Sequence, residues 1–382
     1  MSSSKKQRIL QYVAYAPPHI GWYETHLTQW AEQWVKEGYG ECLVATYSVW
    51  QPEGVSEYSE KNYRVIVIPA FEIITNFPFP KFRTKEYRQA HKTMKEFNPD
   101  IVVTRTRFFL SSLFGWLRAR WHRKQRVHIE HGSEYVKLAT PRKSACAWLY
   151  DQTIGRIVLR TADLVLGVST GAERFVHRFT SRVVPVIHRG MDFNPQPWIR
   201  NVLKEIVHIG FVGRIVSLKW LDIFLRSCAN IREWWKTNFM VTIIGDGDER
   251  SRLEQLAKEL TLTEYVAFVW FKSKQELETE RYPRFDIMIN PSYQEWLPTS
   301  VLEGLFAQCV VVATNVGGTN EITDKEDLLL SPAGDQTAFT ENLLYALEHY
   351  PELQWRSQAR VIKKFSWSSN IEAVARVFEK HL

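Results

Sequence analysis

Two glutamates, Glu295 and Glu303, flank a proline where an apolar run gives way to a helical pattern. Pro298 suits the first position of that helix, where its missing N–H costs nothing. The amides of Thr299 and Ser300 would then face outward from the helix N-terminus, which is a ready site for a diphosphate. Carboxylates beside it could accept hydrogen bonds from sugar and ribose hydroxyls. Most glutamate pairs at this spacing are surface charges, so the indication rests on the strand, loop, proline and helix together.

A glycine and two cations follow the first expected strand of the second half. Gly213 and Arg214 come directly after an apolar run, and Lys219 stands five residues later at the expected start of a helix. An arginine grips phosphate oxygens through two N–H groups, and a lysine adds a point charge. These residues are candidates for binding a diphosphate. From spacing alone, two solvated surface cations are an equally good interpretation.

Further candidates are two glycine-containing loops and a histidine. Gly317 and Gly318 follow another apolar run and would let the backbone approach a ligand closely, although a plain tight turn explains them as well. In the first half, Gly21 lies in the loop after the first expected strand, and His131 stands at the end of a later one. A lone histidine in such a place is more often structural than functional.

These residues stand at the ends of short β-rich runs that alternate with amphipathic stretches, which predicts parallel βαβ units in an α/β, doubly wound fold. In the first half the expected strands are 8–14, 41–46, 64–69, 101–104, 127–130, 164–168 and 183–187, with a helix over 24–36. In the second half they are 206–211, 240–244, 266–270, 286–290, 310–313 and 328–330, with helices over 220–236 and 248–260. The prolines and polar residues of 195–204 indicate a linker between two Rossmann-like halves. A ligand is expected in the cleft between the halves, outside the carboxyl ends of the strands.

The composition narrows the class of protein. A length of 382 residues accommodates two domains, and 45% hydrophobic with 24% charged residues is typical of a globular protein. The four cysteines are scattered without a CxxC pair, which argues against a disulfide framework or a zinc site and indicates a cytoplasmic protein. No apolar run approaches the roughly 18 residues that span a bilayer, and no signal peptide is apparent.

The net charge of +7 predicts an anionic partner: a nucleic acid, a phosphorylated substrate or a membrane surface. Nucleic acid is not expected, because the basic residues are dispersed and no known binding module is apparent. Residues 76–88 of the first half mix aromatic and basic side chains, with Lys92 and Lys95 beyond them. They could dock at the inner face of an anionic membrane. A solvated loop and helix face explains them equally well.

Together these features resemble the retaining glycosyltransferases of family 4, which have the GT-B fold, over nearly the whole chain. The most specific part is the E-x7-E motif, matched by Glu295 and Glu303 and followed by the Gly317-Gly318 segment. Arg214 and Lys219 match the family's phosphate-binding pair. Residues 186–192 resemble the segment that closes the first domain, and residues 365–367 resemble the start of the C-terminal helix.

The resemblance implies an organisation and a set of roles. Residues 1–197 would bind the acceptor, residues 198–365 would bind the nucleotide-sugar donor, and residues 366–382 would form a helix that returns to the first domain. Arg214 and Lys219 would neutralise the donor diphosphate, helped by the amides after Pro298. Glu303 would hold the ribose and Glu295 the transferred sugar. Gly21 would lie under the diphosphate, and His131 would meet the donor sugar. No metal or other cofactor would be required.

The sequence departs from the family at several glycine positions that carry tryptophan. These are Trp22, Trp220, Trp270 and Trp296, and Trp116 is a further candidate. One hypothesis is that a UGA codon read as glycine in the source organism has been translated as tryptophan. The alternative is a protein whose donor loops are blocked.

The leading interpretation is a glycosyltransferase that moves a hexose from GDP-mannose or a UDP-sugar to a glycan or lipid-linked acceptor in cell-envelope polysaccharide synthesis. A non-catalytic nucleotide-sugar-binding protein and a sugar-nucleotide epimerase on the same fold are the alternatives.

Overall fold

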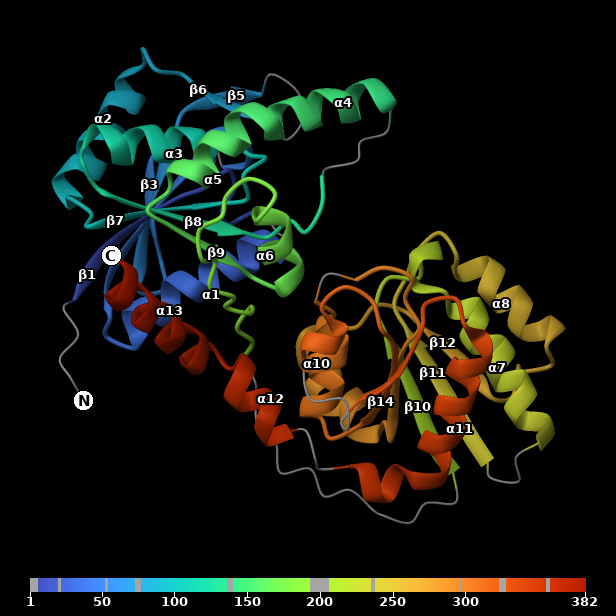
Figure 1. The fold of residues 1–382 in the computed structure, drawn as a ribbon. Helices are drawn as coiled ribbons and strands as arrows, with labels where there is room; N and C mark the ends of the chain where they lie inside the picture. Colours follow the sequence, from blue (N-terminus) through green and yellow to red (C-terminus); the bar gives the residue numbers. More distant parts are fainter. Residues whose placement is uncertain are drawn as a thin grey trace. The chain divides into compact units, whose positions relative to one another are not determined.

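The computed structural model describes residues 6–19, 22–51, 54–72, 77–135, 140–192, 206–234, 238–295, 297–322, 328–354 and 358–382. The chain divides into two compact units, shown in Figure 1. Unit 1 comprises Met1–Met191 with Phe365–Leu382, and unit 2 comprises Asp192–Lys364. The expected linker at 195–204 lies outside the described residues.

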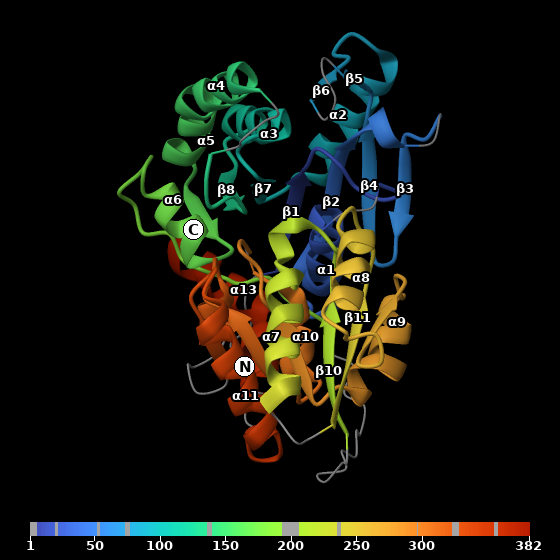
Figure 2. The same cartoon turned by 90° about the vertical axis from the view of Figure 1, so that its right-hand side faces the viewer.

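Unit 1 is built on a sheet whose described strands have the order β3-β4-β2-β1-β7-β8-β9. Its strands are parallel except for the antiparallel β3–β4 pair. They are β1 (Gln7–Tyr12), β2 (Gly40–Tyr47), β3 (Glu57–Glu60), β4 (Tyr63–Ile68), β7 (Ile101–Arg105), β8 (Gln125–Glu130) and β9 (Leu164–Gly167). A separate hairpin joins β5 (Ala70–Glu72) to β6 (Pro78–Pro80), and Figure 2 shows it near α2 (Lys85–Phe97).

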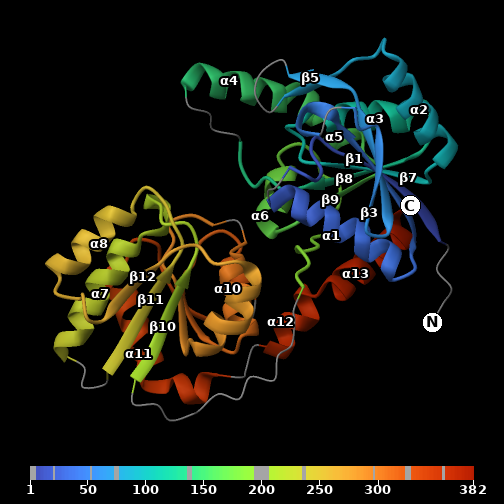
Figure 3. The same cartoon turned by 180° about the vertical axis from the view of Figure 1, so that it is seen from behind.

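Alternate residues of this sheet face two layers of helices. Ile9, Ile101 and Val103 pack with α1 (Trp22–Lys36) and α13 (Trp367–His381), which lie side by side in Figure 3. Leu10 and Val102, one residue further along their strands, pack instead with α2 and α3 (Leu110–Trp121). This period of two is what a sheet covered on both faces requires. The remaining helices of the unit are α4 (Pro141–Tyr150), α5 (Arg156–Thr161) and α6 (Thr170–Val176), with short turns η1 (Ser48–Trp50) and η2 (Asp151–Gly155).

The C-terminal helix belongs to the core of unit 1. Trp367, Ile371 and Phe378 are at most 3% exposed and share a cluster with Trp30 and Trp34 of α1. Apolar residues three, four and seven apart place these side chains on one face of the helix. The return of this helix to the first domain, expected from the resemblance, is confirmed.

Unit 2 is built on a parallel sheet whose described strands have the order β12-β11-β10-β13-β14-β15. Its strands are β10 (Ile206–Val212), β11 (Asn238–Ile244), β12 (Val266–Val269), β13 (Ile287–Asn290), β14 (Val310–Thr314) and β15 (Leu328–Ser331). Its helices are α7 (Leu221–Trp234), α8 (Arg250–Glu259), α9 (Lys274–Glu276), α10 (Thr299–Phe306), α11 (Gln336–Leu353) and α12 (Gln358–Phe365). Its described part also contains three short 3₁₀ helices, η3 (Ser217–Lys219), η5 (Tyr282–Arg284) and η6 (Thr319–Glu321), and one π-helical segment, η4 (Leu277–Arg281).

The strand order of unit 2 reverses direction between β10 and β13, which are neighbours in the sheet. The backbone of β10 lies against the ring of Phe285 at Gly210, where a Cβ atom would come within 2.4 Å of that ring. In doubly wound sheets such a reversal opens a crevice outside the carboxyl ends of the two strands. The loops after β10 and β13 are therefore where a ligand site of unit 2 is expected.

The expected doubly wound α/β architecture is confirmed, with one strand prediction wrong. Residues 183–187 form no strand and make a single bridge, between Val186 and Gly167. Pro185 lacks an N–H for a ladder, and Val183 is 75% exposed. The short strands β3, β5 and β6 were not predicted, because they carry no apolar run.

Candidate functional site

The loop after β10 brings Gly213 and Arg214 to the carboxyl edge of the unit 2 sheet. The amide of Gly213 donates to Ile244 at the end of β11, at 3.0 Å. Gly245 lies so close that a Cβ on it would come within 1.9 Å of the carbonyl oxygen of Gly213, and its φ of +147° is in the range that favours glycine. Arg214 is exposed, and its side chain makes no hydrogen bond or ion pair with any described residue. An arginine held this way is available to an anion.

Lys219 ends the short turn η3 and forms an ion pair with Oε1 of Glu295, from the loop after β13. The side chains of Lys219 and Glu295 are 18% and 12% exposed. The same oxygen lies 2.8 Å from the hydroxyl of Ser292 and accepts a hydrogen bond of 3.3 Å from the amide of Asn290. The structure thus brings together two predicted residues that are 76 positions apart.

The position of Glu295 leaves part of its carboxylate available. Its Oε1 atom accepts the hydrogen bonds from Lys219, Asn290 and Ser292. Its Oε2 atom makes no hydrogen bond with a described residue. Asn290 and Ser292 were not assigned a role from the sequence. The signal was their position, because Asn290 is the polar last residue of a buried strand and Ser292 follows it by two residues.

The helix α10 begins directly after Pro298, which is buried. Pro298 was predicted at the first helical position, and the structure instead places it one residue earlier, at the N-cap with φ −71° and ψ 111°. The difference is physically small, because both positions tolerate a missing N–H. No side chain caps the helix, so the amides of Thr299 and Ser300 face outward as expected.

Glu303 lies one turn into α10 and accepts a hydrogen bond from the hydroxyl of Tyr282. Tyr282 is 2% exposed, and its pKa is raised well above its ordinary value by burial and by the charge of Glu303. The tyrosine therefore stays protonated and holds the carboxylate in place. Tyr282 was missed from the sequence, where it stands among charged residues with no motif around it.

The two glycines after β14 differ in conformation. Gly317 has φ +55°, in the left-handed region where glycine is favoured, whereas Gly318 has φ −91° and caps the turn η6. Conformational freedom is thus required at Gly317.

His131 lies in unit 1, directly after β8, and is 6% exposed. Its ring packs edge-to-face with that of His26 at a centroid distance of 5.2 Å. Burial, and then the charge of Arg105, lower the pKa of His131 to about 3. The imidazole is therefore neutral near pH 7 and can act toward a ligand only as a neutral hydrogen-bonding group. Gly21, its predicted companion in unit 1, lies outside the described residues.

The tryptophans at expected glycine positions are not equivalent. Trp220, next to Lys219, has φ +47°, a left-handed conformation that is rare for a bulky residue. Its ring lies 4.8 Å from that of Tyr293 and close against Gly334. Trp270 is 63% exposed beneath the guanidinium of Arg250. Trp22 begins α1, Trp116 lies within α3, and Trp296 lies outside the described residues.

The part of the chain that the structure describes contains neither a cluster of metal-ligating side chains nor a membrane-spanning helix. No group of three or more His, Cys, Asp or Glu side chains there is arranged to hold a metal ion. None of the helices there is long and apolar enough to cross a bilayer.

Comparisons with known families decide the class of protein. The family described as "Glycosyltransferase Family 4" matches residues 23–194, and that described as "Glycosyl transferases group 1" matches residues 207–349. The chain is a family 4 glycosyltransferase. The first match lies in the half that carries His131, and the second covers Arg214, Lys219, Glu295 and Glu303.

Individual relatives agree with this assignment. An uncharacterized glycosyltransferase of Methanocaldococcus jannaschii is 25% identical to this glycosyltransferase, over 98% of this chain and 99% of the relative. The D-inositol 3-phosphate glycosyltransferase of Mycolicibacterium smegmatis is 26% identical over 73% of this chain and 67% of its own.

Solved structures confirm the GT-B fold of this glycosyltransferase. Sucrose-phosphate synthase from Thermosynechococcus elongatus superposes with a TM-score of 0.71 at 18% identity, covering 98% of both chains. HepE of Anabaena, solved in complex with UDP, superposes with a TM-score of 0.72 at 16% identity, and the match covers 98% of this chain and all of HepE.

Proposed function

We propose that this enzyme is a retaining glycosyltransferase that moves a hexose from a UDP-sugar to a glycan or lipid-linked acceptor in cell-envelope polysaccharide synthesis. The observation that carries the proposal is the set of polar groups at the reversal point of the unit 2 sheet. They are the unpaired Arg214, the Lys219–Glu295 pair and the uncapped N-terminus of α10. A uridine donor is favoured over GDP-mannose because HepE was solved with UDP and with UDP-glucose.

Each group has a role that follows from its charge. Arg214 and the amides of Thr299 and Ser300 present positive charge without a partner among the described residues, so they suit the donor diphosphate. Lys219 adds a second cation while remaining beside Glu295. Oε2 of Glu295 is the acceptor we assign to a hydroxyl of the transferred sugar, and the Tyr282-held carboxylate of Glu303 is assigned to the ribose.

These groups stabilise the charge that develops on the departing diphosphate. The bond between the anomeric carbon and the diphosphate oxygen breaks, and the acceptor oxygen bonds to the same face of that carbon. The acceptor's proton passes to an oxygen of the leaving phosphate. The proposal requires no protein nucleophile, and it assigns charge neutralisation to side chains and the helix terminus.

Calorimetric titration with UDP and GDP tests the donor site. We expect UDP to bind and Arg214→Ala to weaken it about tenfold or more, because a charge-assisted contact to phosphate is lost. Lys258→Ala, an exposed change on α8, is the matched control and should bind as the parent does. No binding of UDP, or equal binding by both variants, would contradict the proposal.

Product analysis separates transfer from the related reactions. UDP-glucose incubated with and without an acceptor extract, followed by mass spectrometry, should yield a glycosylated product only when acceptor is present. An isomerised nucleotide sugar formed without acceptor would instead identify an epimerase.

A non-catalytic nucleotide-sugar-binding protein is a second candidate, and Trp220 is the observation that favours it. A left-handed tryptophan beside Lys219 fills space next to the donor residues. If it blocks the site, Trp220→Gly together with Trp22→Gly, Trp270→Gly and Trp296→Gly should gain donor affinity and turnover. Equal affinity would show that the tryptophans are harmless. Reading the coding DNA tests the codon hypothesis, because UGG at these positions rules it out.

A lipid-linked acceptor would bring the enzyme to a membrane surface, so part of unit 1 is proposed to face anionic lipid. Residues 77–88 are described and carry the half-exposed Phe82 with basic residues on both sides. Residue 76 lies outside the described part.

A further inference from the structure

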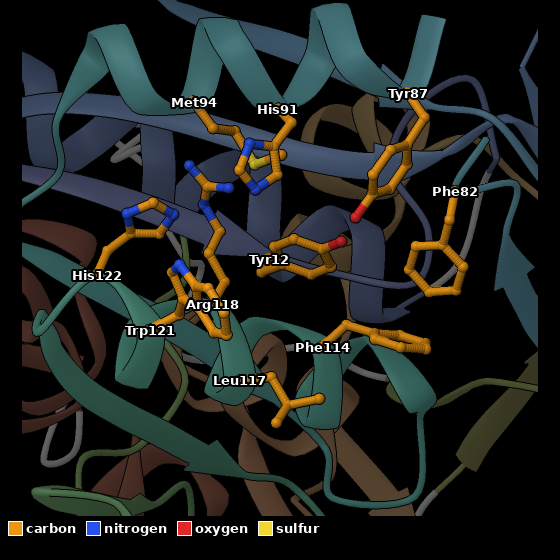
Figure 4. Close-up of a pocket in the computed structure, with 10 residues that line it drawn as sticks. All are labelled: Tyr12, Phe82, Tyr87, His91, Met94, Phe114, Leu117, Arg118, Trp121 and His122. Carbon is orange, nitrogen blue, oxygen red and sulfur yellow. The ribbon is translucent and has the colours of Figure 1, made fainter. Parts of the chain in front are cut away.

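A groove between α2 and α3 lies in unit 1 and contains none of the predicted donor residues. Its cavity of about 460 Å³ is lined by side chains from both helices, by Tyr12 at the end of β1 and by Phe82 after β6 (Figure 4). A second cavity of about 440 Å³ continues it and shares Met94, Arg118 and His122. We call the two together the α2–α3 groove.

One end of the groove is aromatic and apolar. Phe82 packs against Tyr87 at 5.2 Å and against Phe114 at 5.6 Å between ring centroids. Phe82 is nevertheless 43% exposed, Leu117 is 45% exposed and Trp121 is 85% exposed. Exposed apolar side chains gathered beside a cavity indicate a surface that meets another apolar phase.

The other end is cationic and holds Arg118. Figure 4 shows its side chain rising from α3 between the imidazole rings of His91 and His122, which are 5.8 Å apart. The Nη1 atom of Arg118 is buried and has no hydrogen-bond partner among the described residues. Lys95 and Lys124 also line this end, and no carboxylate lines either cavity.

The charge here is therefore uncompensated. Burial lowers the pKa of Arg118, and burial followed by the charge of Arg118 lowers the pKa of both histidines. Arg118 is partly buried, and a cation that is partly removed from water without a charge partner, beside open space, indicates a site for an anion. Nearby Arg120 and Arg123 likewise make no ion pair with a described residue.

We propose that the α2–α3 groove binds the phosphate of an anionic phospholipid at a membrane surface, with Arg118 on the phosphate and Phe82, Leu117 and Trp121 against the acyl region. Two arguments favour a lipid over a soluble phosphate ester. The apolar side chains beside the cation are exposed, and tryptophan is the residue enriched at bilayer interfaces. Five of the nine residues from Arg118 to Arg126 are basic, a density typical of segments that bind anionic lipid.

The inference deepens the proposed use of a lipid-linked acceptor, and it rests on that function only for its biological setting. It differs in location, because the groove is lined by residues of α2 and α3 with Tyr12 and Phe82 of unit 1, whereas Arg214, Lys219 and Glu295 lie in unit 2. Lipid binding and donor binding can therefore fail separately.

Vesicle flotation with the full-length protein tests the inference. The vesicles are phosphatidylcholine alone, or phosphatidylcholine mixed with phosphatidylglycerol. We expect binding only to the mixed vesicles, with Arg118→Met and Trp121→Ser each lowering the partition coefficient about fivefold or more. Arg174→Met, which removes an exposed charge on α6, is the control and should bind as the parent does.

Three results would overturn the inference. They are no binding of the parent to mixed vesicles, equal binding by Arg118→Met and Arg174→Met, and displacement of bound vesicles by millimolar glycerol phosphate, which would identify a soluble ligand. Trp121 is exposed, so Trp121→Ser keeps the test valid if Arg118→Met folds poorly. Calorimetry with UDP on the same preparations separates the two proposals: loss of vesicle binding with normal UDP affinity concerns the groove alone, and loss of UDP binding concerns the donor site alone.

Discussion

Two arginines of unit 1, Arg107 fully buried and Arg118 partly buried, have surroundings of opposite charge balance. Arg107 is 1% exposed and bonds Glu130 and Asp151 at 3.0 Å each, and both carboxylates are fully buried. Burial opposes the charge of Arg107, but the two carboxylates outweigh it and raise its pKa. Arg118 in the α2–α3 groove has a buried Nη1 atom without a partner among the described residues, and burial lowers its pKa.

The difference separates a structural charge from a binding charge. The charge of Arg107 is compensated within the unit by two carboxylates, and Glu130 also accepts from the amide of Gly132 at 2.7 Å. Arg107 donates further to the carbonyl of Glu134, although its Nε atom and Oδ1 of Asp151 have no hydrogen-bond partner among the described residues. A buried network whose cation is paired with carboxylates holds elements together and presents no unpaired positive charge to an anionic ligand. Arg118 has no carboxylate partner among the described residues, which lowers the stability of the fold. An anionic ligand would offset this cost. The predictions below test this contrast through the free energy of unfolding, in decreasing order of effect.

Replacing Arg107 by leucine should give the largest change. Glu130 and Asp151 would remain buried without a cation, which costs about 3–5 kcal/mol of unfolding free energy. Urea denaturation followed by circular dichroism measures it. Arg126→Leu is the control, because its pair with Asp163 is partly exposed and should contribute less than about 1 kcal/mol. Equal losses in the two variants would show that the Arg107 network is not the stronger structural element.

The unfolding free energy should fall at low pH because Glu130 becomes protonated. Its pKa is about 2 in the folded chain against an ordinary 4.5, because Arg107 and His128 overcome the effect of burial. The unfolded chain therefore binds more protons between these values, and stability falls as the pH drops through 4.5 toward 2. Between pH 6 and pH 3 the loss from this group should be about 2 kcal/mol.

The matched variant for this pH series is Glu130→Gln, which cannot titrate. The gap in unfolding free energy between parent and variant should shrink by that amount over the same range. His131, with a folded pKa of about 3, adds its own loss between pH 6.5 and 3 in both proteins. Because the charge of Glu130 raises the pKa of His131, this loss is slightly larger in the variant, and the gap shrinks slightly less than Glu130 alone would give. A constant gap would mean that Glu130 is not held ionised by Arg107.

The Lys219–Glu295 pair of unit 2 is intermediate between the Arg107 network and Arg118 in how far its charges are compensated. It is an ion pair of partly buried side chains with one carboxylate oxygen left over. Glu295→Gln should lower the unfolding free energy by about 1 kcal/mol, because an amide still accepts hydrogen bonds. Donor turnover should fall about a hundredfold or more if the carboxylate acts on the transferred sugar. Turnover close to that of the parent would restrict Glu295 to a structural role.

Elements carried by local pattern were predictable from the sequence, and contacts made across the sheets were not. Apart from β3, β5 and β6, the strands of both units follow from apolar runs. The prediction of a strand over 183–187 was wrong because Pro185 and the exposed Val183 break the ladder. The contact of Lys219 with Glu295 needs β10 and β13 to be neighbours, which strand order decides and spacing does not.

The α2–α3 groove was even less predictable from the sequence than the Lys219–Glu295 contact. Its lining comes from Tyr12, Phe82, α2 and α3, none of which forms a motif in the sequence. The aromatic and basic residues of 76–88, with Lys92 and Lys95, were predicted as a candidate membrane surface, without the groove. Arg118, the residue whose charge is left unpaired, stands in a different helix and became visible only when α2 and α3 were packed together.

Arg118→Met should give the smallest change in stability, and its sign is the sharpest test of the comparison. Methionine keeps the apolar stem that packs in the groove and removes a cation that burial disfavours. The unfolding free energy should therefore stay within about 1 kcal/mol of the parent, on the side of greater stability. A loss of 2 kcal/mol or more by urea denaturation would mean that the guanidinium has a structural partner, and the groove would then resemble the Arg107 network. Unchanged or higher stability combined with weaker binding to anionic vesicles is the pattern that only a binding charge produces.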